Sequence, residues 1–314
     1  MDINCTDIEL LLFEKIARAA ASIHADSYVI GGFVRDKLLG RECKDIDVVC
    51  VGDGIALAHE VARQFDPAPQ VHFFKNFGTA QIRLDDLDIE FVGARKESYR
   101  SDSRNPAVEA GSLEDDQNRR DFTINALAIS LQKSDYGKLL DPFGGLQHLG
   151  EKVIKTPLAP GETFSDDPLR MMRAVRFATQ LGFVIEEKTL EAISSNAGRI
   201  RIVSGERIAD ELNKILMCRK PSIGFDLLYK TGLLQEIFPQ MVALAGAEYI
   251  DGMGHKDNFY HTLQVVDNIC EHTNDLWLRW AAVLHDIAKT ATKKFEEGHG
   301  CTLHGPDAAA ARLA

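Results

Sequence analysis

The sequence lacks closely spaced cysteine pairs and long apolar segments. Its six cysteines are scattered over 314 residues without a C-x-x-C pair, so neither a disulfide framework nor a zinc site is indicated. No apolar run approaches the length of a membrane span, and the first residues form an amphipathic pattern without a basic leader. We therefore expect a cytoplasmic protein with no membrane partner.

An excess of positive charge is also missing. The formal net charge is −11, which disfavours a protein that coats nucleic acid through bulk charge. Any contact with RNA would have to come from local basic groups, such as Arg119 with Arg120, or Arg170 with Arg173 and Arg176. With 45% apolar residues, the chain can build the cores of two or three domains.

The two halves of the chain differ in their periodicity. Residues 27 to 93 mix short β-like runs with one helical stretch, whereas apolar residues after about position 160 follow helical spacing. We predict an α+β fold, with a mixed-sheet head followed by an all-α C-terminal half. Between the halves, residues 99 to 118 are polar and aperiodic, and we expect a mobile loop there.

Two aspartates, Asp45 and Asp47, lie in a predicted strand after a Gly-Gly turn and a short helix. Alternate residues of a strand point the same way, about 6.5 Å apart, so both carboxylates can hold the same metal ions. Gly31 and Gly32 let the backbone approach a triphosphate at the start of the helix, and Arg35 can add a charged hydrogen bond. Two Mg²⁺ ions on oxygen ligands can activate a hydroxyl and stabilise leaving pyrophosphate. This set of groups predicts nucleotidyl transfer.

Further motifs follow in order along the chain. They are R-R-D-F-T-I-N-A-L at 119–127, D-P-F-G-G-L at 141–146, D-D-P-L-R-M-M-R at 166–173 and G-E-R-I at 205–208. Together with the glycine and aspartate segments, they resemble the class II tRNA nucleotidyltransferase and bacterial poly(A) polymerase family over roughly residues 27 to 240. One departure is Asp166, which stands where the family usually has Glu.

The resemblance implies template-independent addition of C and A nucleotides, from CTP and ATP, to the 3′ end of tRNA. It assigns the nucleotide phosphates to Gly32 and Arg35, two Mg²⁺ ions to Asp45 and Asp47, and the nucleotide to Arg120. It also implies three domains: a palm-like nucleotidyltransferase head at 1–155, a helical neck and body that binds RNA and the base at 156–245, and the start of an HD-like helical domain at 246–314.

A helix predicted from Asp167 to Phe177 has one apolar side and one basic side. Arg170, Arg173 and Arg176 lie within an arc of about 120°. Asp167 can accept from the amino group of cytosine or adenine, and Arg170 can donate to the same Watson–Crick edge. The family assigns base reading to this pair, with nucleotide contacts added by Arg173. The alternative is a salt-bridged helix face, above all for Arg176, which has turned farthest from Asp167.

A third carboxylate of the site could be Asp88 or Glu90. Both lie on one side of the predicted strand D-I-E-F-V, so alternation alone does not choose between them. A solvent-facing or salt-bridged role is the alternative for each.

Near the carboxyl end, His261, the pair His285-Asp286 and His304 resemble the HD family of metal-dependent phosphohydrolases. That family has a final aspartate later in the chain, and none suitable follows here before Ala314. We therefore expect an incomplete site that would take a transition metal only in a longer form of the protein.

Several functions remain open at this point. A bacterial poly(A) polymerase shares every catalytic motif named above, and enzymes that add only CC or only A are further alternatives. The HD-like region favours the tRNA enzyme. A phosphohydrolase of the HD class is disfavoured by the missing aspartate.

Overall fold

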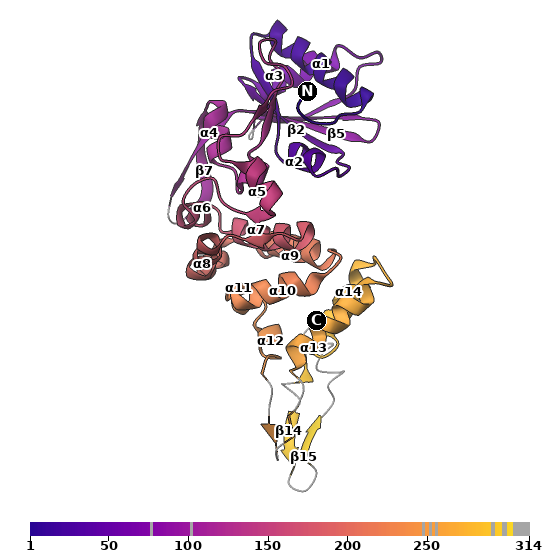
Figure 1. Ribbon diagram of the computed structural model, residues 1–314, viewed down its shortest axis with the longest axis vertical. Helices are drawn as coiled ribbons and strands as arrows, with labels where there is room; N and C mark the ends of the chain where they lie inside the picture. Colours follow the sequence, from indigo (N-terminus) through magenta and orange to yellow (C-terminus); the bar gives the residue numbers. More distant parts are fainter. Residues whose placement is uncertain are drawn as a thin grey trace. The chain divides into compact units, whose positions relative to one another are not determined.

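The computed structural model describes residues 1–75, 78–100, 103–246, 249–250, 253–254, 257–289, 293–296 and 300–303. Contacts divide the chain into two compact units, Met1–Asp166 and Asp167–Ala314 (Figure 1). None of the helices in the described ranges combines the length and the apolar character needed to span a bilayer.

A seven-stranded mixed sheet forms the centre of the first unit. The strand order is β3-β4-β5-β2-β1-β8-β9, with β2 and β5 parallel and the other neighbours antiparallel. The predicted mixed-sheet head is confirmed. The strands are β1 (Asp26–Ile30), β2 (Asp45–Val51), β3 (Val71–Phe74), β4 (Thr79–Leu84), β5 (Leu87–Gly93), β8 (Ala128–Ser130) and β9 (Leu139–Leu140).

Two helices close one face of this sheet. The first, α1 (Asp7–Ser22), begins with a capping box of Thr6 and Glu9, and α3 (Gly54–Ala62) is capped by Asp53. They contact each other, α1 packs on β1, and α3 packs on β4 and β5 (Figure 1). The strand residues beneath them are fully buried: Ile46, Val48, Ile82, Ile89 and Phe91. Burial of these side chains fixes which residues of each strand point to the opposite face.

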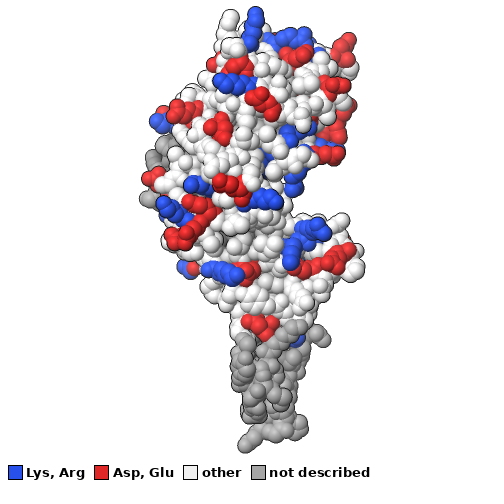
Figure 2. Space-filling view, viewed as in Figure 1, with Lys and Arg blue, Asp and Glu red and all other residues white. Residues whose placement is uncertain are grey.

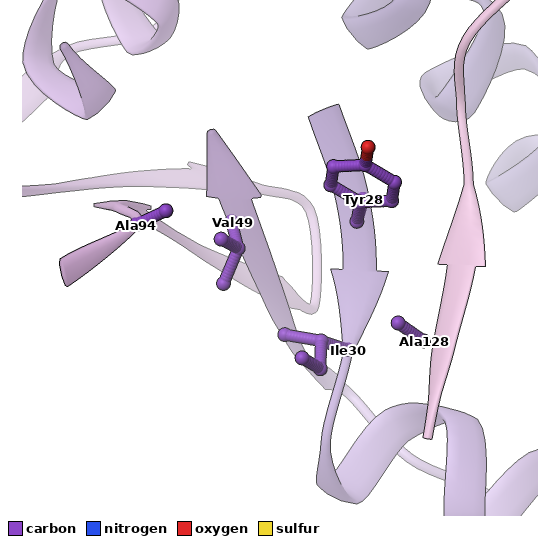
Figure 3. Packing of buried hydrophobic residues seen from close by; sticks show 5 residues of the cluster. All are labelled: Tyr28, Ile30, Val49, Ala94 and Ala128. Atoms are coloured by element: carbon purple, nitrogen blue, oxygen red, sulfur yellow. The ribbon is translucent and has the colours of Figure 1, made fainter. Parts of the chain in front are cut away.

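The opposite face of the sheet is partly apolar. Tyr28, Ile30, Val49, Ala94 and Ala128 form a buried cluster there (Figure 3), and leucines from outside the central strands pack against it. Ile30 is the register partner of Asp47 on β2. Partners on neighbouring strands point to the same face, so this apolar cluster borders the aspartate.

The expected mobile loop at 99–118 is wrong for the described residues. Strands β6 (Arg95–Arg100) and β7 (Ser103–Ala110) form a hairpin, and helix α4 (Leu113–Asn118) follows. A hairpin needs only main-chain hydrogen bonds between its own strands, so a polar sequence can form one. The helix starts with a capping box in which Ser112 and Asp115 satisfy each other's main-chain amides.

Short elements complete the first unit around the sheet. They are α2 (Gly32–Leu38), the 3₁₀ helix η2 (Thr123–Asn125), α5 (Gly145–Glu151), β10 (Val153–Ile154) and α6 (Pro160–Asp166). Helix α2 packs against β1, β2 and η2, so the glycine turn and the 119–127 motif are brought together.

The second unit is mainly helical, as predicted. Its helices are α7 (Leu169–Leu181), α8 (Glu187–Asn196), η3 (Ala197–Ile202), α9 (Gly205–Leu216), α10 (Pro221–Lys230), α11 (Leu233–Ile237), α12 (Pro239–Val242), α13 (Asn258–Cys270) and α14 (Leu276–Leu284). The expectation of helices alone was wrong in detail, because strands of two to four residues are too short to show a periodicity. These strands are β11 (Val184–Ile185), β12 (Tyr249–Ile250), β13 (Met253–Gly254), β14 (Lys293–Glu296) and β15 (Gly300–Leu303).

A buried arginine joins two of these helices. Arg279 of α14 is 2% exposed, and its Nη1 donates to the carbonyls of Leu216 and Cys218 at 2.8 and 3.0 Å. The rest of its guanidinium donates to the carbonyl of Thr273 and to the side chain of Asn274. A cation at the end of α9 also complements the helix dipole.

Candidate active site

The glycine turn after β1 lies against two charged side chains. Gly31 has φ 85° and ψ −137°, a conformation that essentially only glycine adopts. A Cβ at this position would lie 2.7 Å from Nη1 of Arg120 and 3.0 Å from Oδ2 of Asp47. The backbone conformation therefore requires glycine, a side chain here would also displace Arg120 and Asp47, and the turn brings together residues from three separate motifs.

The predicted carboxylate pair stands at the start of β2. Asp45 and Asp47 alternate with the buried Ile46, so both point away from α1 and α3. They line a hollow of about 520 Å³ together with Asp88 and Glu90 of the parallel neighbour β5. The register pairs Asp45 with Asp88 and Asp47 with Glu90. The hollow therefore gathers four carboxylates from two strands.

Burial raises the pKa of the two inner carboxylates, Asp47 and Glu90. It raises the pKa of Asp47 above its usual range, while the guanidinium of Arg120 opposes the shift and Asp45 adds to it. Burial also raises the pKa of Glu90, and the neighbouring Asp47 raises it further. Oxygen donors with mutual repulsion in an open hollow fit a divalent cation such as Mg²⁺. Of the two candidates for a third carboxylate, Glu90 is the one beside Asp47, whereas Asp88 is 3.7 Å from the guanidinium of the exposed Arg83.

A fully buried aspartate positions Arg120. Asp116 of α4 is 0% exposed and accepts from Nε of Arg119 at 2.9 Å and from Nε of Arg120 at 3.1 Å. Burial alone would raise the pKa of Asp116, but Arg120 and Arg119 hold it below its usual range. The sequence prediction missed this residue. Its signal was the acid three and four positions before a pair of arginines on a helix.

Arg35, predicted to bind phosphate, lies in a hydrogen-bond network. Its side chain is 5% exposed and donates to Oδ1 of Asn125 at 2.7 Å and to both carboxylate oxygens of Asp36. Asn125 in turn donates to Asp121 at 2.9 Å. The guanidinium also lies beside Gly32, 3.7 Å from the position of a Cβ there. Its contact with a phosphate stays a prediction.

The candidate base-reading residues lie in the second unit. Helix α7 begins at Leu169, two residues later than predicted, because Pro168 occupies the cap position and Asp167 accepts from the amide of Leu169 at 3.2 Å. Arg170 and Arg173 are half-exposed on the side opposite a buried face of Met171, Ala174, Val175 and Ala178.

The third arginine of α7 has a structural partner. Nε of Arg176 donates to the buried Glu211 of α9 at 2.6 Å, and its guanidinium lies 4.0 Å from the ring centroid of Phe177. A structural salt bridge therefore explains Arg176 better than a nucleotide contact does.

The HD-like residues also come together. His261 of α13 and the pair His285 and Asp286 after α14 offer ligand atoms within 4.8 Å of one another, a nitrogen and oxygen set that suits transition metals. Nζ of Lys289, however, donates to Oδ2 of Asp286 at 2.7 Å and supplies a positive charge there. His304 lies outside the described residues.

Charges of both signs are mixed on the surface. On the face shown in Figure 2, lysine and arginine side chains alternate with aspartate and glutamate over both units. This mixture agrees with the net charge of −11 and with nucleic-acid contact through local groups.

Three family models match the chain in succession. They are the poly A polymerase head domain over residues 27–155, the probable RNA and SrmB-binding site of polymerase A over 182–244, and the HD domain over 258–312. The first match contains the glycine turn and the carboxylate hollow. The second and third cover the helical unit.

Several curated relatives are tRNA nucleotidyltransferases. The A-adding enzyme of Aquifex aeolicus is 41% identical over 213 residues, and the CCA-adding enzyme of Geobacillus sp. is 39% identical over 210 residues. These matches cover 67% and 66% of this chain, but only 25% and 50% of the relatives. The chain thus spans a quarter to a half of their length. The A-adding enzyme of Halalkalibacterium halodurans is 31% identical over 301 residues, which are 94% of this chain and 69% of the relative.

Solved structures agree in fold and sequence. A tRNA nucleotidyltransferase complexed with a primer tRNA and an incoming ATP analog matches at a TM-score of 0.66 and 31% identity. The match covers 86% of this chain and 75% of that one. The order of motifs, the carboxylate hollow and these similarities confirm the resemblance, and the chain belongs to the tRNA nucleotidyltransferase and poly(A) polymerase family.

Proposed function

We propose that this chain adds nucleotides from CTP and ATP to the 3′ end of tRNA without a nucleic-acid template. The observation that carries the proposal is the hollow that Asp45 and Asp47 line together with Glu90, beside the Gly31 turn and Arg120. Relatives named for A addition and for CCA addition support the class of reaction.

The reaction is a displacement at the α-phosphorus of the incoming nucleotide. The 3′-hydroxyl oxygen of the acceptor bonds to this phosphorus, and the bond from phosphorus to the oxygen bridging to the β-phosphate breaks. Pyrophosphate leaves with the bond electrons, and the hydroxyl proton passes to a carboxylate or water in the site. Asp45 and Asp47 would hold Mg²⁺, which supplies charge stabilisation for the attacking and leaving oxygens.

The chain's own residues divide the remaining tasks. The turn at Gly31 and Gly32 opens helix α2, whose main-chain amides can bind the triphosphate. Arg120, held by Asp116, supplies positive charge beside Asp47. We assign the reading of cytosine and adenine to Asp167 and Arg170, with nucleotide contacts from Arg173.

The proposal includes a domain organisation and a location. The head at 1–155 carries the chemistry, the neck and body at 156–245 bind RNA and base, and the HD-like domain starts at 246. A tRNA-processing enzyme of this kind is expected in the cytoplasm.

The choice between full CCA addition and A addition alone depends on specificity. A poly(A) polymerase or a CC-adding enzyme would use the same hollow, and the relatives include both A-adding and CCA-adding enzymes. The second candidate we retain is therefore A addition, which the Halalkalibacterium relative favours because its similarity extends over nearly the whole chain.

The test is to incubate the protein with Mg²⁺, each NTP separately, and tRNA transcripts that end before CCA, after C or after CC. CCA addition requires CTP incorporation into the first two transcripts and ATP incorporation into the third. Incorporation of ATP alone, only after CC, identifies A addition, and repeated ATP addition to every transcript identifies a poly(A) polymerase.

Two variants test the hollow in the same assay. Asp45→Ala and Asp47→Ala should each abolish addition, because losing one carboxylate removes several kcal/mol of charge stabilisation. The control is Asp86→Ala. This exposed aspartate lies in the turn between β4 and β5, and its carboxylate pairs with Lys44. Near-normal turnover by either hollow variant would refute the assignment.

A further inference from the structure

A row of polar side chains crosses the sheet from the carboxylates to its edge. Asp47 of β2 is in register with Glu90 of β5, which is in register with Gln81 of β4, and Gln81 with His72 of β3. Register partners point to the same face, and all four residues line the hollow that contains Asp45. At the usual spacing of strands, the row extends about 14 Å.

The outer two residues of this row are open to a ligand. Gln81 and His72 are exposed, whereas the next residue of β4, Ile82, is 1% exposed under the helices. On β3, the residue after His72 also points to the helices, since the ring of Phe73 lies 6.0 Å from that of His59 on α3. In the part of the chain that the structure describes, the side chains of Gln81 and His72 make no hydrogen bond.

The geometry of the displacement indicates which substrate binds on the β5, β4 and β3 side of the hollow. In a displacement at phosphorus, the attacking oxygen and the leaving pyrophosphate lie on opposite sides of the phosphorus. The glycine turn, which we propose binds the triphosphate, follows β1. Strand β1 adjoins β2 on one side, and β5 adjoins β2 on the other. If the leaving group lies towards β1, the acceptor hydroxyl must approach from the side of β5, β4 and β3.

We propose that Gln81 and His72 bind the 3′ end of the acceptor RNA, an inference that rests on the proposed function. The Gln81 amide both donates and accepts, as recognition of the ribose hydroxyls of the last nucleotide requires. The imidazole of His72, one strand farther from the carboxylates, donates to the preceding phosphodiester. The row is longer than one stacked nucleotide, whose rise is about 3.4 Å, so it can hold both groups. These are positioning residues, because they fix the RNA rather than the reacting phosphate.

A kinetic comparison tests the two residues. Gln81→Leu and His72→Asn should each lower kcat/KM for the tRNA acceptor about fivefold to tenfold, the loss expected for one hydrogen bond. KM for CTP and ATP should stay within about twofold, because the β1 side is untouched. The matched control is His24→Asn, at an exposed histidine that lines a different hollow beside α1, and it should change neither constant.

A cross-linking experiment locates the acceptor without turnover. A tRNA transcript whose last nucleotide is 4-thiouridine, irradiated with the protein and Mg²⁺, should cross-link to peptides spanning residues 71–83. Cross-links confined to Gly31–Leu38 or to the second unit would overturn the inference, as would equal increases in KM for NTP and for tRNA. If the protein adds no nucleotide to any transcript, the proposed function is refuted. The cross-links need no catalysis, so they still show where the RNA end binds.

Discussion

Asp116 is a single carboxylate that holds two guanidinium groups. Its side chain is 0% exposed, and it accepts from both Arg119 and Arg120. Arg120 reaches from this anchor to the Gly31 turn, where its charge offsets the burial of Asp47. One residue therefore sets the position of the Arg120 guanidinium, whose charge acts on Asp47.

We predict that Asp116→Asn lowers the free energy of unfolding by about 3 kcal/mol, because it leaves two partly buried cations without their counter-charge. The folded-state pKa of Asp116 lies below the unfolded value. Its stabilisation is therefore complete above about pH 4 and is lost as the pH falls through the folded-state pKa. Urea unfolding at several pH values should show the difference from wild type shrinking only below about pH 4. Glu114→Gln, an exposed change on the same helix, is the control; an equal effect there would refute the anchor role.

At the scale of elements, helix α7 has one buried face that packs on its neighbours and one partly exposed face that carries its arginines. The buried face fixes the helix, Arg176 is tied to Glu211, and Arg170 and Arg173 stay half-exposed near the amino end. Asp167, to which we assign the reading of the base, stands just before the helix, where it accepts from the amide of Leu169.

Asp167→Ala should reduce discrimination of CTP and ATP against UTP and GTP about tenfold, with a smaller effect on triphosphate affinity. The measurement compares relative kcat/KM for the four nucleotides. Asp210→Ala, at an exposed aspartate of α9, provides the control. Unchanged selectivity in Asp167→Ala would leave Asp167 only its hydrogen bond to the amide of Leu169.

A second prediction at this scale concerns the junction of α14 with α9. Arg279→Met should lower the free energy of unfolding by about 3 kcal/mol, since several buried carbonyl oxygens lose their donor. Arg279→Lys should recover part of this loss, because an ammonium can still donate to the end of α9. Chemical denaturation of both variants, with the exposed Arg219→Met as control, checks the order. A fully stable Arg279→Met would show that water replaces the guanidinium.

The sequence predicted the strands and helices whose apolar residues follow a regular spacing, and it missed the elements that have no such pattern. The five strand runs between residues 27 and 93 were found from their β-branched and apolar residues, and four of these strands have buried residues, whereas the edge strand β3 has none. The β6–β7 hairpin was missed because its pairing is local and its residues are polar. Asp116 was missed because it lies in a polar stretch that was interpreted as a loop. The alignment of Gln81 and His72 with Asp47 was missed because it depends on strand order and register, which a single sequence does not reveal.

At the scale of the whole molecule, the two chemistry-bearing regions differ in completeness. The hollow of the head joins four carboxylates to a glycine turn, whereas the HD-like cluster has three ligands in the described residues, and Lys289 already neutralises one of them. An incompletely held transition metal loses the geometry needed to activate water.

We therefore predict nucleotide addition without appreciable metal-dependent phosphodiesterase activity. The assay follows hydrolysis of 2′,3′-cyclic nucleotides with Ni²⁺, Mn²⁺ or Co²⁺ in parallel with NTP addition to tRNA. Robust hydrolysis that disappears in His285→Ala would instead reveal a working second active site.

The register of β2 to β5 gives this head an uneven tolerance to changes in length. One residue inserted within β4 would turn every later side chain of that strand over, so that Gln81 and Ile82 would exchange faces. An insertion in the turn at Asp85 and Asp86 would leave the alternation of both flanking strands intact. Natural or engineered versions of this head should therefore vary in length at their turns, while the number of residues within each strand keeps the polar row on the same face as Asp47.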